Sequence, residues 1–182
     1  MSVGHKKDKI KSFLENGEKF GVSVKYLEEE NPLGTAGALK QAENLVDGDF
    51  IVSNSDELKN IDILEMYRIH KERKAIATIA LTTVSDPHGY GVASLSGSKI
   101  VEFTEKPKKG NHSSNLINAG FYIFSSEIFD YIPKGKSSLE KDVFPKLVKE
   151  ERLFGYPFSG QWYNTSTIKD YEKAIKNWVD IR

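Results

Sequence analysis

The segments Pro32-Leu-Gly-Thr-Ala-Gly-Ala-Leu39 and Phe50-Ile-Val-Ser-Asn-Ser-Asp56 frame the stretch around which the rest of the chain is organised. The first predicts the start of an amphipathic helix over 34–46, whose small residues leave backbone N–H groups open to an anion. The second is an apolar run without alternation, which predicts a strand over 50–54 that is covered on both faces. Asp56 follows this strand, at the end where ligands bind in open α/β sheets.

The composition limits the classes of function. Among 182 residues, 26 Lys and Arg balance 26 Asp and Glu, so no overall field favours nucleic acid or an anionic membrane. The absence of cysteine excludes disulfides and thiolate metal sites, and the four histidines lie singly, which argues against zinc. Neither a signal peptide nor a membrane-spanning run is recognisable. We therefore expect one cytoplasmic domain, 1–182, without a nucleic-acid or membrane partner.

Helical and strand patterns alternate along the chain, which predicts a three-layer, Rossmann-like α/β fold with a mostly parallel sheet flanked by helices. The pattern over 90–105, with Ser96-Gly97 at its middle, predicts a hairpin and thus an antiparallel excursion. Two helices carry apolar stripes that we expect to pack inward: Ile61, Leu64, Tyr67 and Ile69 in one, and Ile168, Tyr171, Ile175 and Trp178 in the other.

Further motifs follow the opening stretch in a fixed order. Besides Glu29 with Pro32–Leu39 and Asn54-Ser-Asp56, they are Tyr90-Gly-Val92, Glu105-Lys-Pro107, Asn118-Ala-Gly120, Ser138-Leu-Glu-Lys-Asp-Val-Phe-Pro145 and Trp162-Tyr-Asn-Thr-Ser-Thr167. Together they resemble the sugar-1-phosphate nucleotidyltransferase family, most closely its mannose-1-phosphate guanylyltransferase-like branch. In that family an oxygen of a sugar 1-phosphate attacks the α-phosphorus of a nucleoside triphosphate and releases pyrophosphate. This chemistry depends on positioning and charge neutralisation.

The resemblance implies a role for particular residues. Glu29 and Gly34 would lie at the base and ribose, and Asp56 would be a ligand of Mg²⁺. The residues facing the sugar phosphate would be Gly91, Glu105, Lys106 and Asn118, which offer close approach, hydroxyl acceptors and an ammonium for phosphate. The residues alone also permit simpler readings: a surface glutamate at Glu29, a turn or N-cap aspartate at Asp56, and a solvated charge pair at Glu105-Lys106.

The sequence departs from the family pattern at several places. The family's N-terminal unit, a strand and a Gly-rich loop followed by a catalytic lysine, has no counterpart, so no residue here is predicted to be catalytic. The second metal-binding aspartate of the family is Asn164, and two family glycines are Ser55 and Ser166. Each change weakens nucleotidyl transfer, and the loss of a carboxylate lowers the expected metal affinity.

Two functions follow from these departures. The chain is either one piece of a split enzyme whose missing unit is encoded separately, or a non-catalytic module that binds a nucleotide sugar, a sugar phosphate or a protein partner. A missing strand would also leave a sheet edge unpaired, which we expect near Ser2 and Val3. We therefore expect a homo-oligomer or a complex with a separate N-terminal piece.

Overall fold

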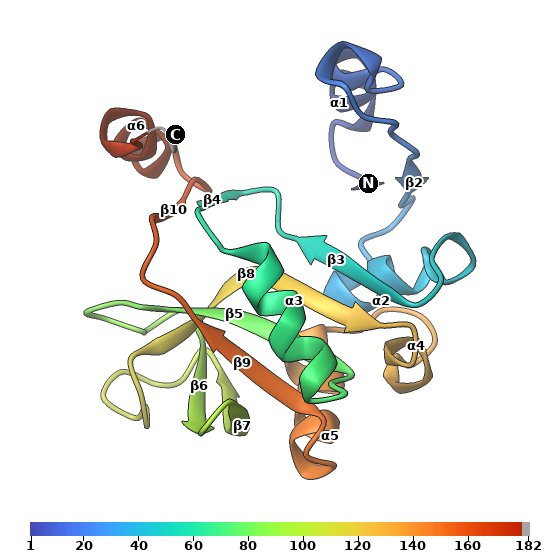
Figure 1. Ribbon diagram of the computed structural model, residues 1–182. Coiled ribbons are helices and arrows are strands. Elements are labelled where there is room, and N and C mark those ends of the chain that lie inside the picture. The colour runs from blue at the N-terminus through green and yellow to red at the C-terminus, as the bar shows by residue number, and fades with distance from the viewer. Residues whose placement is uncertain (180–182) are drawn as a thin grey trace.

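The structure, a computed structural model, describes residues 1–179, and Figure 1 shows its longer strands in a central sheet. The strands are β1 (Ser2–Val3), β2 (Leu27–Glu28), β3 (Asp49–Ser53), β4 (Glu57–Lys59), β5 (Ala77–Thr83), β6 (Gly91–Ser96), β7 (Lys99–Glu105), β8 (Leu116–Ser125), β9 (Leu153–Pro157) and β10 (Trp162–Asn164). The α-helices are α1 (Lys7–Leu14), α2 (Gly34–Lys40), α3 (Ile63–Glu72), α4 (Ile128–Tyr131), α5 (Phe144–Lys149) and α6 (Ile168–Asn177). Shorter helical turns are η1 (Glu18–Phe20), η2 (Glu43–Leu45) and the π-helical η3 (Leu139–Val143).

The central sheet has six strands in the order β3-β8-β5-β9-β7-β6. Strands β3, β5 and β9 run in one direction, as predicted, because β8 is antiparallel to both β3 and β5, and β9 is parallel to β5. The expected antiparallel excursion is the β6–β7 hairpin, which also contacts β8. The α/β class and the prevailing strand direction are thus confirmed, while the position of β8 between β3 and β5 makes most ladders antiparallel.

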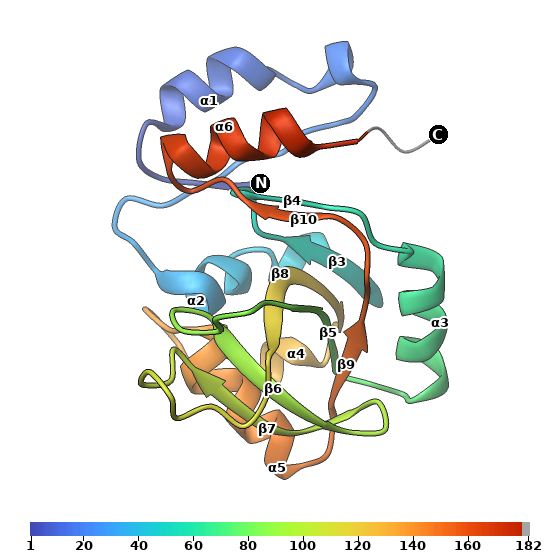
Figure 2. The ribbon, with the colours of Figure 1, turned by 90° about the vertical axis from the view of Figure 1, so that its left-hand side faces the viewer.

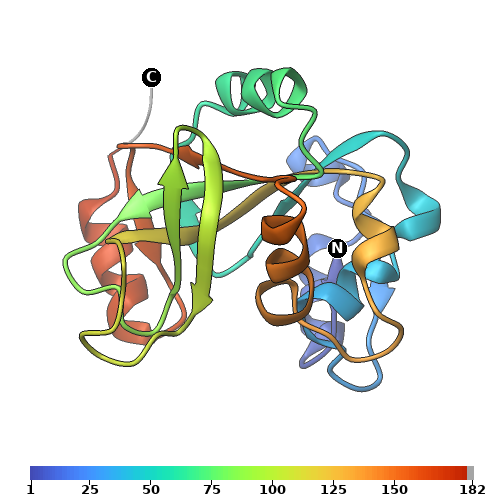
Figure 3. The ribbon, with the colours of Figure 1, turned by 90° about the horizontal axis from the view of Figure 1, so that it is seen from below.

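Helices cover both faces of this sheet and give the predicted three layers (Figure 3). On one face, α2, α4, η3 and α5 enclose a core that includes Tyr122, Phe124 and Phe144. On the other face, Met66 of α3 packs on Ala80 and Ile123. Burying one such large side chain contributes about 1.5–3 kcal/mol, so these two clusters hold the strands in register. Within residues 1–179, no helix is long and apolar enough to cross a membrane.

Two smaller units extend from the same end of the sheet (Figure 2). One consists of the parallel pair β1–β2 with α1 and η1, and the other of the antiparallel pair β4–β10 with α6. The inward stripe predicted for α6 is wrong, since Ile168 and Ile175 are 80% and 61% exposed and Ala174 is the buried residue of this helix. Helical periodicity showed that an apolar face exists, but it does not show whether a partner covers it.

One open edge of the central sheet lies at β3. Strand β1 belongs to a separate two-stranded sheet and has β2 as its one strand neighbour among residues 1–179, so an unpaired side near Ser2 and Val3 is present as expected, with Val3 itself buried. The prediction that the strand over 50–54, here β3, is covered on both faces is wrong, because the Ile51 side chain is 50% exposed. The stripe predicted for α3 fails for a related reason: Leu64 is 80% exposed, and the helix buries Met66 instead.

Candidate functional site

Gly91, Glu105, Lys106 and Asn118 come together although they lie far apart in the sequence. Gly91 pairs with Glu105 across the β6–β7 ladder, and the contact of Val92 with Ile117 brings β8 alongside. A Cβ atom at Gly91 would lie 2.6 Å from the Phe103 ring and 3.0 Å from Oε2 of Glu105. The absence of a side chain at Gly91 therefore leaves room for the Phe103 ring and the Glu105 carboxylate beside β6.

The motif Asn118-Ala119-Gly120 forms a bulge in β8. The register with β5 passes from Ile79 opposite Tyr122 to Leu81 opposite Asn118, so β8 has extra residues here. Gly120 takes the left-handed conformation with φ of 60°, and its N–H donates to Asn118 Oδ1 at 3.0 Å. Asn118 Nδ2 donates to the Tyr122 hydroxyl at 2.9 Å. Both polar atoms of the Asn118 side chain thus stabilise the bulge.

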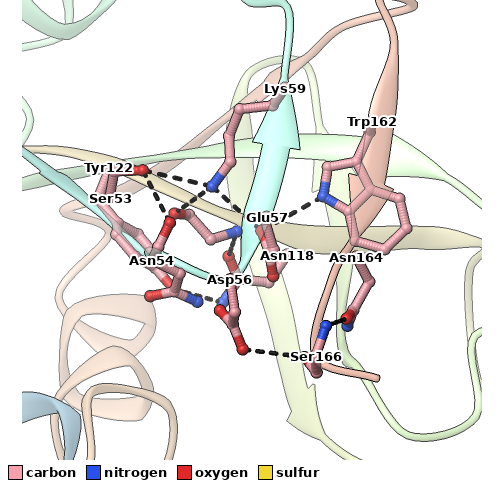
Figure 4. A network of polar contacts seen from close by, with 11 residues as sticks. Ser53, Asn54, Asp56, Glu57, Lys59, Asn118, Tyr122, Trp162, Asn164 and Ser166 are labelled. Atoms are coloured by element: carbon pink, nitrogen blue, oxygen red, sulfur yellow. Dashed lines mark hydrogen bonds and ion pairs between the residues drawn. The ribbon is translucent and has the colours of Figure 1, made fainter. Parts of the chain in front are cut away.

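A buried polar network that sequence reasoning missed supports this bulge (Figure 4). Lys59 Nζ donates to the Gly120 carbonyl at 2.9 Å and lies 3.2 Å from Glu57 Oε2, which also accepts the Trp162 indole N–H at 3.3 Å. The side chains of Lys59 and Glu57 are only 6% and 10% exposed. Burial lowers the pKa of Lys59, and the charges of Glu57 and Asp56 oppose this shift. The sequence contained one signal for this network. Glu57 and Lys59 carry opposite charges two residues apart, so their side chains face the same side of a strand.

Carboxylates from three elements gather near the buried Tyr122 hydroxyl. Burial raises the pKa of Tyr122 strongly, and the nearby charges of Glu140, Glu57 and Glu105 raise it further. Burial also raises the pKa of Glu105, with a further contribution from Glu140. Glu140 in turn accepts hydrogen bonds from the hydroxyls of Thr35, at 2.8 Å, and Ser138, at 2.7 Å. Grouped carboxylate oxygens are acceptors suited to a ligand with several hydroxyl groups.

Lys106 adds an exposed positive charge beside these carboxylates. Its ammonium lies 3.8 Å from Oε1 of Glu105, and its side chain is 66% exposed. The backbone has φ of 47°, which is uncommon for a residue with a side chain, and its N–H donates to the Tyr90 carbonyl at 3.0 Å. This turn presents an ammonium next to an acceptor group, which together can bind a phosphate and a hydroxyl.

The start of α2 is not the open anion site that the sequence predicted. The N–H groups of Ala36 and Gly37 both donate to the Ser137 carbonyl, at 3.0 and 3.3 Å. The helix ends at Lys40 and is followed by η2, so the helix predicted over 34–46 is also too long. Gly34 has φ of 76°, and a Cβ atom there would lie 2.4 Å from the Ser137 carbonyl oxygen. Packing against Ser137 thus accounts for this glycine without any ligand.

The carboxylate of Glu29 is likewise used within the chain. Oε1 accepts a hydrogen bond from the Ser2 hydroxyl at 2.7 Å, and Oε2 accepts one from the Leu33 N–H at 2.9 Å. These bonds connect the β1–β2 unit to the segment that precedes α2. A role of Glu29 and Gly34 at the base and ribose stays a prediction.

Asp56 and Asn164, the residues of the predicted metal site, lie together at one end of the β4–β10 pair. Ser166 Oγ donates to Asp56 Oδ2 at 2.9 Å, and the Ser166 N–H donates to Asn164 Oδ1 at 2.7 Å (Figure 4). The neighbouring Glu57 is bonded to Lys59 and Trp162 instead. Residues 1–179 contain no group of three or more His, Cys, Asp or Glu side chains that could hold a metal ion. This donor set does not fit a Mg²⁺ site built on two carboxylates.

Comparison with known proteins identifies the family. The nucleotidyl transferase model matches residues 2–180, so the chain belongs to the nucleotidyl transferase family. The mannose-1-phosphate guanyltransferase of Yarrowia lipolytica is 38% identical over 89% of this chain and 46% of its own length. A protein of Bacillus anthracis, crystallised with sucrose, superposes on 100% of this chain and 76% of its own, with a TM-score of 0.86 and 28% identity. HddC of Yersinia pseudotuberculosis superposes on 96% of this chain and 76% of its own, with a TM-score of 0.81 and 26% identity.

These matches confirm the resemblance inferred from the motifs. They extend over nearly the whole chain, which spans about half the length of the relatives it matches. The relatives include mannose-1-phosphate guanyltransferases and a UTP–glucose-1-phosphate uridylyltransferase from Synechocystis. Proteins of this family bind sugar phosphates and nucleotides and generally use divalent metal ions.

Proposed function

We propose that residues 1–182 act as a single nucleotidyltransferase-like domain that binds a sugar phosphate or nucleotide sugar but does not transfer a nucleotidyl group by itself. The observation that carries this proposal is the placement of Glu105 and Lys106 beside Gly91 and the rigid Asn118 bulge. The guanyltransferases among the relatives support a mannose 1-phosphate-like ligand. A cytoplasmic location stays a prediction.

The two alternatives, a piece of a split enzyme and a non-catalytic module, differ in what the Asp56 end of the site can do. Ser166 is bonded to both Asn164 and Asp56, and this arrangement favours a non-catalytic binding module. A split enzyme requires a second chain with the Gly-rich loop and lysine. If Mg²⁺ takes part in such a complex, Asp56 is the residue that would hold it, together with phosphate oxygens of the ligand.

For the partner we propose a second copy of the chain or a separately encoded piece that pairs at the β3 edge. Ile51, Ile63, Leu64 and Tyr67 surround a groove of ≈ 250 Å³ beside this edge. All of them are more than 40% exposed. An unpaired strand next to exposed apolar side chains is a template for another chain.

Replacing Lys106 with alanine should weaken the binding of mannose 1-phosphate by about 10- to 100-fold, because a charged hydrogen bond to phosphate contributes roughly 1.5–3 kcal/mol. Isothermal titration calorimetry measures the effect. Lys169→Ala, on the exposed side of α6, is the matched control and should leave the affinity unchanged. Equal affinities of the Lys106→Ala variant and the unmodified chain would show that Lys106 is only a surface charge.

The chain alone should release no pyrophosphate from GTP and mannose 1-phosphate in the presence of Mg²⁺. The reason is that residues 1–182 hold no counterpart of the Gly-rich loop and lysine that the resemblance assigns to the triphosphate. The start of α2 does not replace them, since the Ser137 carbonyl already accepts the N–H groups of Ala36 and Gly37. A coupled pyrophosphate assay tests this directly. Turnover at rates typical of enzymes, ~1 s⁻¹ or above, would contradict the proposal of a binding module.

A further inference from the structure

The Ser166 hydroxyl lies on the Asp56 carboxylate, at the place where the resemblance implies a glycine. The bond from Ser166 Oγ to Asp56 Oδ2 is 2.9 Å long, and the Thr165 N–H donates to the Asp56 carbonyl at 2.8 Å. Asp56 is therefore held to the segment after β10 by a main-chain bond and a side-chain bond. Ser166 is exposed, so this hydroxyl also meets water and any ion that approaches the carboxylate.

Asn164 is a weaker cation ligand than an aspartate at this position would be. Its Oδ1 accepts the Ser166 N–H at 2.7 Å, so one of the two lone pairs of the amide oxygen is already used within the chain. Its amide is also neutral, so Asp56 contributes the only negative charge of this pair. A cation such as Mg²⁺ binds oxygens at about 2.0–2.1 Å and requires ligands on several sides.

The remaining charges near Asp56 do not compensate for this loss. Glu57 directs its carboxylate to Lys59 and Trp162, away from Ser166 (Figure 4). The buried Lys59 ammonium interacts favourably with the Asp56 charge, which makes the surroundings less attractive to a second cation. The Lys59 ammonium thus supplies a positive charge near Asp56 that would otherwise come from a bound cation.

We propose that Ser166 and Asn164 stand where the resemblance implies a divalent-cation site and form a hydrogen-bonded link instead. This link joins the residue before β4 to the segment after β10, so that the chain holds Asp56 in place without a metal ion. Two side chains carry this change. Asn164 is uncharged where an aspartate would be negative, and Ser166 places a donor on Oδ2 of the remaining carboxylate. Restoring an aspartate and a glycine at these positions should therefore create a cation site that the unmodified chain does not have.

The test compares Mn²⁺ binding by the unmodified chain and by the Asn164→Asp/Ser166→Gly variant. Calorimetry and the electron paramagnetic resonance signal of free Mn²⁺ both report binding without any enzymatic assay. The double variant should bind Mn²⁺ at least ~10-fold more tightly, since a second carboxylate faces the ion and no hydroxyl competes. The melting temperature of the double variant should rise with added Mn²⁺, while that of the unmodified chain should not.

Asp56→Asn in the double-variant background is the control, and it should abolish the gained binding. Two results would overturn the proposal: equally tight Mn²⁺ binding by the unmodified chain that is lost on Asp56→Asn, or a folded double variant that binds no more tightly. Far-ultraviolet circular dichroism establishes that each variant is folded. The titrations contain no sugar phosphate, so they remain decisive even if the proposed ligand does not bind.

Discussion

Replacing Lys59 with methionine should destabilise the fold by about 3–5 kcal/mol, because it leaves the Glu57 carboxylate buried without its positive partner. The two side chains are 6% and 10% exposed, and Nζ lies 3.2 Å from Glu57 Oε2. The substitution also removes the donor to the Gly120 carbonyl at 2.9 Å, which stabilises the β8 bulge. Urea denaturation followed by circular dichroism measures the loss as a lower unfolding midpoint.

A surface ion pair in the same protein provides the matched control. Lys71 lies 2.8 Å from Asp49 Oδ2, but its side chain is 58% exposed, so Lys71→Met should cost less than about 1 kcal/mol. In the Lys59→Met/Glu57→Gln double variant, no buried charge is left alone, and part of the stability should return. If Lys59→Met costs no more than Lys71→Met, the buried network does not support the bulge.

The sequence was sufficient for the class of fold and the family, but not for the strand pairing. Helical and strand periodicities are local properties, and they correctly indicated α/β layers and the β6–β7 hairpin. The insertion of β8 between β3 and β5 is a long-range arrangement that no local pattern encodes. The same reason explains the errors at Leu64 and Ile175, whose apolar character was evident while their exposure depends on neighbours distant in the sequence.

The residues of the candidate site were likewise predicted from the sequence only in part. The motifs containing Gly91, Glu105 and Asn118 were recognised, and the structure brings them together. Lys59 went unrecognised although its spacing from Glu57 was a signal, because its second partner is the Gly120 main-chain carbonyl at the bulge. The supposed anion site at α2 failed because the Ser137 carbonyl, about a hundred residues away, approaches its N–H groups. Such main-chain partners leave no signature in residue types.

The exposed β3 edge predicts that two copies of the chain associate. Strand β3 has β8 as its neighbour on one side, while its other side faces no strand among residues 1–179. Antiparallel pairing of two copies centred on Ile51 would place Asp49 opposite Ser53 and Phe50 opposite Val52. No like charges then face each other, and the exposed Ile51 side chains become neighbours. This register also brings the two α3 grooves close to the shared sheet.

We therefore expect the purified chain to associate at micromolar concentrations and Ile51→Lys to raise the dissociation constant at least ~100-fold. Burial of an isoleucine contributes roughly 1.5–3 kcal/mol, a symmetric interface loses this contribution twice, and a lysine on an edge strand opposes pairing. Light scattering over a dilution series measures the association. Val101→Lys is the control, because Val101 is similarly exposed, at 49%, but lies on β7, an inner strand of the sheet. A monomer that unfolds cooperatively at all these concentrations would contradict the prediction and show that β3 is stable as a free edge.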